Sequence, residues 1–300
     1  MNLFCIFARS KSNIMKKLRA LLPVLFGIVV LLSSCDKIEP PYYYMQFDED
    51  VTVEFPPLDE SKVYRKLYME EFTGHRCVNC PAGHEVIEQL KNQYGDTLVV
   101  VGIHYGTLAK PQSSGLYTYD FRTAEGNTLG EYFNIDAIPS AIINRGYELG
   151  GWQRDEWANV LRNQSREVSA ALQLINEYDP ELQTVKANVK VTALKRSNVP
   201  YNLILFLIED GVVKPQKNGT ENIEDYVHNH VLRATFNQQP MGMQLNGGAV
   251  LEPGSSCVYA STLDMSNTDW VPGNCSVVAV LYDYELHEVL QAETLPVISR

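Results

Sequence analysis

The spacing of apolar residues changes near residue 168, and this change restricts the chain to folds with two differently built halves. Upstream, short apolar runs alternate with segments whose apolar residues recur at helical spacing. Strands are expected in KLYMEEFT, DTLVVVGIHYG and AIPSAIINRG, and helices in CPAGHEVIEQLKNQYG, YDFRTAEGNTLGEYFN and GWQRDEWANVLRNQSREV. This alternation predicts a compact α/β domain over residues 62–167.

Downstream of residue 168, apolar residues recur at every second position, as in strands with one buried face. Strands are expected in VSAALQLINEY, QTVKANVKVTALK, YNLILFLIED, CVYASTLDM, CSVVAVLYDYE and EVLQAETLPVIS. Turn sequences such as EPGSS and VPGN separate them. We therefore predict an all-β sandwich of the immunoglobulin or fibronectin type over residues 168–300.

The N-terminal segment has the pattern of an export signal. Basic residues after Met15 precede an apolar run over residues 20–32, which is too short for a stable transmembrane span. The run ends in Leu-Ser-Ser-Cys, which resembles the lipobox of bacterial lipoproteins. We predict that residues 1–34 are a lead and signal peptide, that Cys35 receives a lipid, and that residues 35–61 form a tether. The alternative is an ordinary signal peptide with an incidental cysteine.

The charge of the chain excludes two classes of partner. The formal net charge is -11, and removal of the five basic residues upstream of Cys35 lowers it to -16. So acidic a chain is a poor ligand for nucleic acid or for anionic lipid head groups. We therefore expect membrane attachment through the lipid on Cys35 and not through surface charge.

Cys77 and Cys80 are the strongest candidates for chemistry. They lie at the predicted start of a helix, where unpaired backbone N–H groups and the helix dipole lower the pKa of a thiol. The first cysteine is expected to face solvent and act as the nucleophile, and the second, one turn further, to act as the resolving thiol. His75 and Arg76 add positive charge, which is expected to lower the pKa of Cys77 further.

Two other interpretations of this cysteine pair stay open. In an exported protein, the pair also suits a structural disulfide without chemistry. A metal site is the other interpretation, because Cys77, Cys80 and His84 have the spacing C-x2-C-x3-H, with His75 or His104 as a further ligand. The sequence contains no second C-x-x-C, so we expect no bound metal and no cofactor.

The remaining histidines and cysteines carry structural predictions. His104 ends a predicted buried strand and is expected to be a hydrogen-bonded core residue. His228 and His230 alternate along one predicted strand and are expected to share a face, where they anchor a loop or contact the first domain. A simple hairpin places Cys257 too far from Cys275 for a disulfide, and only another strand arrangement allows that bond.

The arrangement around the first two cysteines resembles the thioredoxin superfamily. A strand leads to C-x-x-C-P at a helix start, and IDAIPSAIIN later supplies a proline after an apolar residue. The resemblance implies that Pro139 is cis and aligns an extended substrate beside the cysteines. It also implies that Glu71 is the buried carboxylate that assists proton transfer to the resolving cysteine. Arg76 and a Val-Asn dipeptide depart from the usual Trp-Cys-Gly-Pro-Cys, so the direction of electron transfer is open.

A more specific resemblance follows from the combination of motifs. The lipobox, EEFTGHRCVNCPAGHE and the later segment YVHNHVLRATF together resemble the Bacteroidetes family related to outer membrane protein 28. The resemblance extends over nearly the whole mature chain. It implies a lipid-anchored protein of the outer membrane, on its periplasmic or its surface-exposed face, with a thioredoxin-like domain.

Two functional hypotheses result. The first is thiol–disulfide exchange on exported proteins, in which Cys77 attacks, Cys80 resolves, Glu71 relays a proton and Pro139 aligns the substrate. The second is a non-catalytic binding or adhesion lipoprotein that uses the thioredoxin fold as a scaffold. The partners are protein thiols and disulfides in the first case, and an unknown envelope component in the second.

Overall fold

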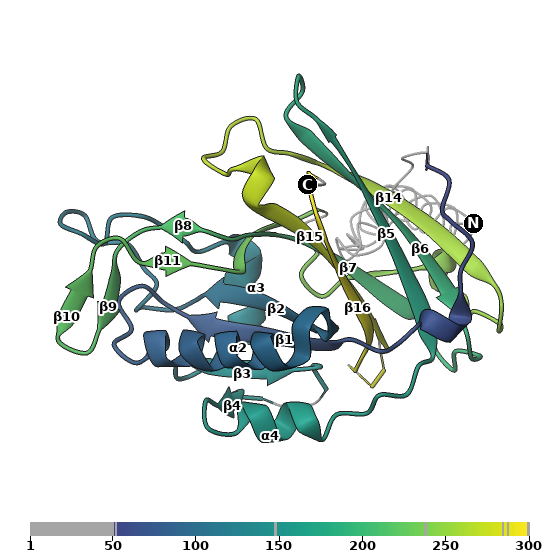
Figure 1. Ribbon diagram of the computed structural model, residues 1–300, viewed down its shortest axis with the longest axis horizontal. Helices are drawn as coiled ribbons and strands as arrows, with labels where there is room; N and C mark the ends of the chain where they lie inside the picture. The colour runs from purple at the N-terminus through teal and green to yellow at the C-terminus, as the bar shows by residue number, and fades with distance from the viewer. Residues whose placement is uncertain are drawn as a thin grey trace, which may run out of the picture. The chain divides into compact units, whose positions relative to one another are not determined.

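One β-sheet extends through both halves of the chain in the computed structural model (Figure 1). The structure describes residues 51, 53–146, 149–236, 239–283, 285–286 and 288–298. The predicted signal peptide, the predicted lipidation site Cys35 and most of the predicted tether lie outside these residues. Within the described residues, no helix is both long enough and apolar enough to cross a membrane.

The described residues of 62–167 form three strands and three helices in segments predicted to hold them, but a further short strand, Trp152–Gln153, lies in the segment predicted as the third helix. The strands are β1 (Leu67–Thr73), β2 (Leu98–His104), β3 (Ser140–Ile143) and β4 (Trp152–Gln153), and the helices are α2 (Cys80–Tyr94), α3 (Ala124–Tyr132) and α4 (Trp157–Arg162). Helix α2 carries Pro81 in its first turn and ends at Gly95, whose φ of 58° suits glycine. Helix α4 is shorter than the segment predicted for it.

The second half consists of strands joined by turns. The strands are β5 (Ala170–Asp179), β6 (Thr184–Ala193), β7 (Tyr201–Glu209), β8 (Val212–Val213), β9 (Gln216–Asn218), β10 (Glu221–Ile223), β11 (Val227–His228), β12 (Val231–Thr235), β13 (Met243–Gln244), β14 (Ser256–Asp264), β15 (Cys275–Asp283) and β16 (Val289–Pro296). Short 3-10 turns occur at Glu60–Lys62, Gly95–Thr97, Asn246–Gly248 and Pro272–Asn274.

The large sheet joins strands from both halves. Over the described ranges it has nine strands, in the order β16-β15-β7-β12-β2-β1-β3-β4, with β13 also paired to β7. Strands β1 and β2 are parallel, and β2 meets β12 through the single parallel pair Gly102–Val231. The sheet therefore contains strands from both sides of residue 168, the predicted domain boundary, which lies between α4 and β5. The division into two domains stays a prediction.

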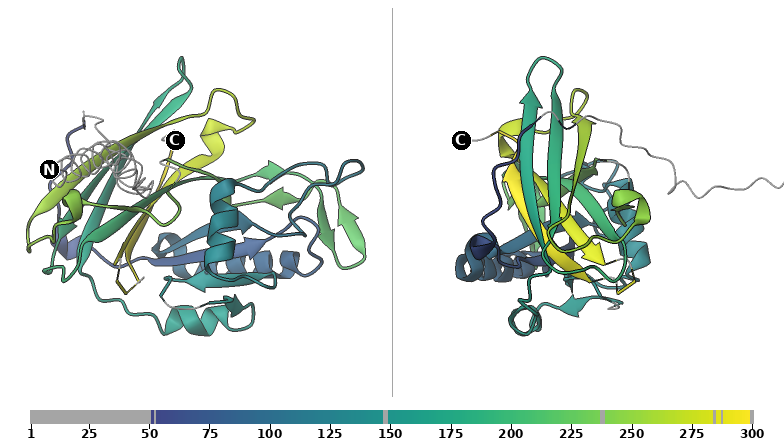
Figure 2. Two further views of the ribbon diagram at one scale, coloured as in Figure 1. Left: turned by 180° about the vertical axis from the view of Figure 1, so that it is seen from behind. Right: turned by 90° about the vertical axis from the view of Figure 1, so that its right-hand side faces the viewer.

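Strand β7 separates two hydrophobic cores. Leu205 and Leu207 pack on one face against the second sheet, β14-β6-β5. Ile204 and Phe206 pack on the other face with residues of β1, β2 and α3. Because successive side chains point to opposite faces, a strand covered on both faces is apolar throughout, and every residue of β7 is buried. Figure 2 shows the second sheet lying over β7, β15 and β16.

Helices cover the other end of the large sheet on both faces. Helices α2 and α4 bury Ile87, Leu90 and Trp157 against β1 and β2, whereas α3 buries Leu129 on the opposite face. The apolar spacing that predicted α2 thus faces the sheet. This packing holds the first turn of α2, which contains Cys80, beside the end of β1.

The fold as described is mainly β-sheet with few helices. One pairing assumed from the sequence is wrong, because β14 and β15 do not form a hairpin. Strand β14 pairs with β6, whereas β15 pairs with β7 and β16. Cys257 and Cys275 therefore lie in different sheets, and both are free thiols.

Replacing Phe206 by alanine tests whether the shared core holds both halves together. The Phe206 ring is fully buried, and a Phe-to-Ala change at such a site costs about 3–5 kcal/mol. We expect the free energy of unfolding in urea to fall by this amount, in one transition that circular dichroism and tryptophan fluorescence report together. The control, Leu182→Ala at an exposed turn, is expected to change it by less than about 0.5 kcal/mol. Two separate transitions would contradict a shared core.

Candidate functional site

Cys77 and Cys80 form a disulfide at the start of α2, with their Cα atoms 5.4 Å apart. Cys77 is only 2% exposed and Cys80 is completely buried. The prediction that Cys77 faces solvent is therefore wrong, because other segments of the chain cover the helix terminus. In this oxidised form the two sulfur atoms are bonded to each other, so the proposed Cys-Cys-His metal set has no thiolates.

The segment before β3 lies against the disulfide. The Ile138–Pro139 peptide bond is cis, as predicted. The Sγ atom of Cys77 lies 3.6 Å from the Ile138 carbonyl oxygen. Gly83 of α2 faces Pro139, since a Cβ atom at this glycine would lie 3.1 Å from the proline Cβ. The structure thus brings together the three elements that the sequence placed here: the cysteines, the helix start and the cis proline.

Glu71 lies on β1 and is 2% exposed. Burial raises the pKa of its carboxyl group to about 8, against a smaller opposing effect of a hydrogen bond with Thr73. Glu71 is therefore protonated at neutral pH. Its Oε1 atom lies 3.7 Å from Nε2 of His84, whose pKa burial lowers to about 4. The two groups are consequently a neutral pair at pH 7 and not a salt bridge.

The residues expected to tune the cysteines have other contacts. His75 is 1% exposed, and burial lowers its pKa to about 4, so at pH 7 it adds no positive charge beside Cys77. The Arg76 guanidinium donates a hydrogen bond to the Thr107 carbonyl. The backbone N–H of Arg76 donates to the Leu108 carbonyl at 3.0 Å. Both residues thus help to fix the loop before α2.

A hairpin from the second half of the chain binds this loop, and the sequence analysis did not predict it. The Lys217 N–H donates to the His75 carbonyl at 2.8 Å, and the Gly219 N–H donates to the Val78 carbonyl at 3.0 Å. The Gln216 side-chain amide donates to the Cys77 carbonyl at 3.0 Å. The Asn-Gly dipeptide at the hairpin tip is a recognised turn signal, but no local pattern shows what the hairpin contacts.

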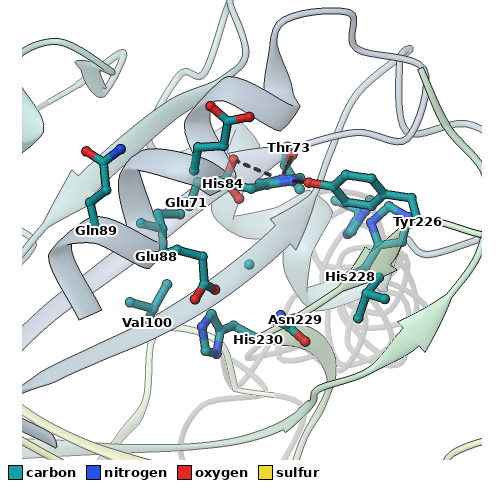
Figure 3. A pocket seen from close by; sticks show the side chains of 15 residues that line it. Glu71, Thr73, His84, Glu88, Gln89, Val100, Tyr226, His228, Asn229 and His230 are labelled. Carbon is teal, nitrogen blue, oxygen red and sulfur yellow. Dashed lines mark hydrogen bonds and ion pairs between the residues drawn. The ribbon is translucent and has the colours of Figure 1, made fainter. Parts of the chain in front are cut away.

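A pocket of about 400 Å³ lies between α2, the ends of β1 and β2, and the segment around β11 (Figure 3). Four histidines line it: His84, His104, His228 and His230. Thr73 Oγ1 and the Tyr226 hydroxyl are hydrogen-bonded to the His84 ring at 2.9 and 2.7 Å. This volume lies within the range of small-molecule sites.

The buried histidines of the pocket are neutral at pH 7. Burial lowers the pKa of His228 to about 3 and that of His104 well below its ordinary value. Neither ring nitrogen of His104 has a hydrogen-bond partner among the described residues, so the prediction of a hydrogen-bonded core histidine is wrong. Strand β11 ends at His228, and His230 has a φ of 58°, so these two residues do not share one strand. No three His, Cys, Asp or Glu side chains in the described part of the chain are placed to ligate one metal ion.

Comparisons with solved structures identify one similar fold with a TM-score above 0.5 among the following three matches. HBP35 of Porphyromonas gingivalis has a TM-score of 0.59 and 17% sequence identity, and the match covers 78% of this chain and 75% of that one. A protein of Agrobacterium tumefaciens gives a TM-score of 0.45 at 14% identity, covering 80% of this chain and 97% of that one. A domain of the outer membrane lipoprotein Omp28 from Porphyromonas gingivalis gives 0.28 at 22% identity, covering 43% and 88%. At these identities the first match supports the fold alone, and the other two carry no structural argument.

Comparison with protein families is more informative. None of the curated proteins matches the chain. The family described as outer membrane protein Omp28 matches residues 126–297, which is more than half of the 300 residues. The match begins downstream of both Cys77 and Cys80. The chain therefore belongs to the Omp28 family of outer membrane proteins, which confirms the family resemblance and the outer-membrane location predicted from the sequence.

Proposed function

We propose that this protein is a non-catalytic binding protein of the outer membrane, anchored by a lipid on Cys35. In this proposal residues 62–167 are a thioredoxin-like scaffold and residues 168–300 a β-sandwich. The observation that carries the proposal is that the Cys77–Cys80 disulfide is buried. Carbonyl groups of the loop that contains Cys77 are bound by a hairpin of the same chain.

The geometry around the disulfide favours a structural role for it. Exchange with a protein substrate needs a sulfur atom that a thiolate can reach, and reactive cysteines are partially exposed for this reason. Cys77 is 2% exposed. The neutral state of His75 removes one of the two charges expected to favour a thiolate. The family match also starts after both cysteines, so family membership gives no support to a redox role.

The pocket beside α2 supports a binding role. Its lining contains the neutral imidazoles of His84 and His228, the protonated Glu71 and the Tyr226 hydroxyl, which can donate or accept hydrogen bonds. The side chains of Glu85 and Glu88 also line it. Ile87 and Val100 supply an apolar part of the wall. A few polar groups set among apolar surface is the usual composition of a small-molecule site.

Thiol–disulfide exchange is the second candidate, and one observation favours it: the Cys77 sulfur of the formed disulfide lies 3.6 Å from the Ile138 carbonyl oxygen, beside Pro139. In the reduced protein, the Cys77 thiolate would attack a substrate disulfide and release one substrate thiolate. The released thiolate would then take the proton of Cys80, whose thiolate attacks the Cys77 sulfur and releases the second substrate thiolate. Two electrons thereby move from the protein dithiol to the substrate, and an envelope dithiol has to return them.

A trapping experiment decides between the two candidates. We expect the Cys80→Ser variant, expressed in the native envelope, to accumulate no mixed disulfide through Cys77, because the sulfur atom is covered. The measurement is non-reducing electrophoresis followed by mass spectrometry of Cys77 peptides. The Cys77→Ser variant is the matched control, since both variants keep Cys257 and Cys275. Partner proteins linked to Cys77 in the first variant and absent from the control would establish the exchange function instead.

The Glu71→Gln variant tests the protonation of Glu71. The folded-state pKa of about 8 lies above the ordinary value of 4.5, so the folded protein holds a proton that the unfolded chain loses between these values. Stability contributed by this proton is complete below pH 4.5 and is lost as the pH rises toward 8. Relative to Glu71→Gln, the free energy of unfolding of the native protein should fall by about 1.4 kcal/mol per pH unit in this window. Urea titrations from pH 5 to 9 measure it, and parallel profiles would contradict a buried neutral Glu71.

A further inference from the structure

Residues 74–79, between β1 and α2, form the loop that contains Cys77, which we call the cysteine loop. The hairpin that binds this loop is small and, over the described residues, is not paired with the large sheet. Strands β9 (Gln216–Asn218) and β10 (Glu221–Ile223) pair with each other through a tight turn at Gly219, which has a φ of 53°. Lys217 is opposite Asn222 in this pair, yet its N–H donates away from β10, to the His75 carbonyl. Strand β9 therefore lies between β10 and the cysteine loop.

Gln216 anchors the hairpin at its base. Its side chain is completely buried, and its amide donates to the carbonyls of Cys77 at 3.0 Å and Gly74 at 3.3 Å. Lys217 and Gly219 add bonds to the carbonyls of His75 and Val78, so the hairpin binds carbonyl groups before Cys77, at Cys77 and after it. These are backbone acceptors that an incoming extended polypeptide would use to pair with the loop.

The outer part of the hairpin has few contacts that hold it. Residues 218–222 are all exposed. Hydrogen bonds join them to the rest of the chain from the Gly219 N–H to the Val78 carbonyl and from the Tyr117 hydroxyl to Asn222, and Asn222 also accepts a bond from Lys217 within the hairpin. A two-stranded hairpin has little stability of its own. Segments with few buried apolar contacts open at a small fraction of the free energy of global unfolding. No residue of 216–223 belongs to the hydrophobic cores of the described chain, so we expect the hairpin to be displaced without unfolding of the large sheet.

We propose that the β9–β10 hairpin is a displaceable cover that controls access to the Cys77–Cys80 disulfide by occupying the pairing edge of the cysteine loop. In the closed form both sulfur atoms are buried. In the open form the carbonyls around Cys77 become available to an extended polypeptide strand, which binds by the same backbone pairing. This inference goes beyond both candidate functions, since it concerns access to the sulfur atoms and not what reacts with them.

The rate of disulfide reduction by a small phosphine tests the cover. Tris(2-carboxyethyl)phosphine attacks one sulfur atom and breaks the S–S bond. Water then supplies the oxygen of the phosphine oxide and the two protons of the thiols, so the phosphine loses the two electrons that the disulfide gains. The readout is alkylation of Cys77 and Cys80, quantified by peptide mass spectrometry after the free thiols have been blocked.

The matched variants are Lys217→Pro and Lys217→Ala. Proline removes the N–H that binds the His75 carbonyl and leaves the pairing with β10, whereas alanine keeps that N–H. We expect reduction to be at least about tenfold faster in Lys217→Pro than in the native protein, and within about twofold of native in Lys217→Ala. Gln216→Ala, which removes the side-chain anchor without a backbone change, should also accelerate reduction.

Equal rates in Lys217→Pro, Gln216→Ala and the native protein would overturn the proposal. So would a native rate as fast as that of the urea-unfolded chain. Circular dichroism melts of each variant show whether a faster rate comes from the hairpin or from general unfolding, and Gln216→Ala keeps the test decisive if the proline variant does not fold. The assay contains no partner protein, so its outcome is independent of whether Cys77 forms mixed disulfides.

Discussion

The burial of β7 and β15 on both faces is the constraint on which the rest of the structure depends. Val277 and Ala279 of β15 face the core beneath the second sheet, whereas Val278 and Val280 face the core shared with β1 and β2. A strand with apolar side chains on both faces would expose one apolar face to water if only the other face were covered. The halves of the chain are therefore joined by a common apolar layer and not by a linker alone.

This junction also determines what surrounds the disulfide. Strand β12 approaches β2 closely at Gly102, whose N–H donates to the His230 carbonyl at 2.7 Å. A Cβ atom at Gly102 would lie 3.3 Å from that oxygen, so a larger residue would strain the contact. The contact places the segment between β7 and β12 over α2 and the cysteine loop. That segment contains both the hairpin and two of the four histidines that line the pocket, so the hairpin and the pocket depend on one strand pairing.

Much of the local structure around the cysteines was predictable. A helix start at Cys80 and a strand that carries Glu71 are encoded within short stretches, because caps and apolar spacing act over a few residues. The long strands of the second half, β5, β6, β7, β14, β15 and β16, were predicted for the same reason, whereas the short strands β8, β9, β10 and β13 were not. The cis bond at Pro139 was expected from the resemblance to the thioredoxin superfamily. Pairing was less predictable: the assumed hairpin of β14 and β15 is replaced by pairing in two sheets, since alternation identifies a strand but not its neighbour.

The accessibility of the site shows the same division between local and long-range information. Composition, the export signal and the helix-terminal cysteines established an acidic exported chain with an oxidisable pair near a proline and a carboxyl group. They also predicted an exposed Cys77 and a charged His75, and both expectations fail because segments distant in sequence bury these residues. Chemical identity and helix position are local properties of a side chain. Its burial, its pKa and its access to a partner depend on which distant strands pack over it, and here only the tertiary structure decided them.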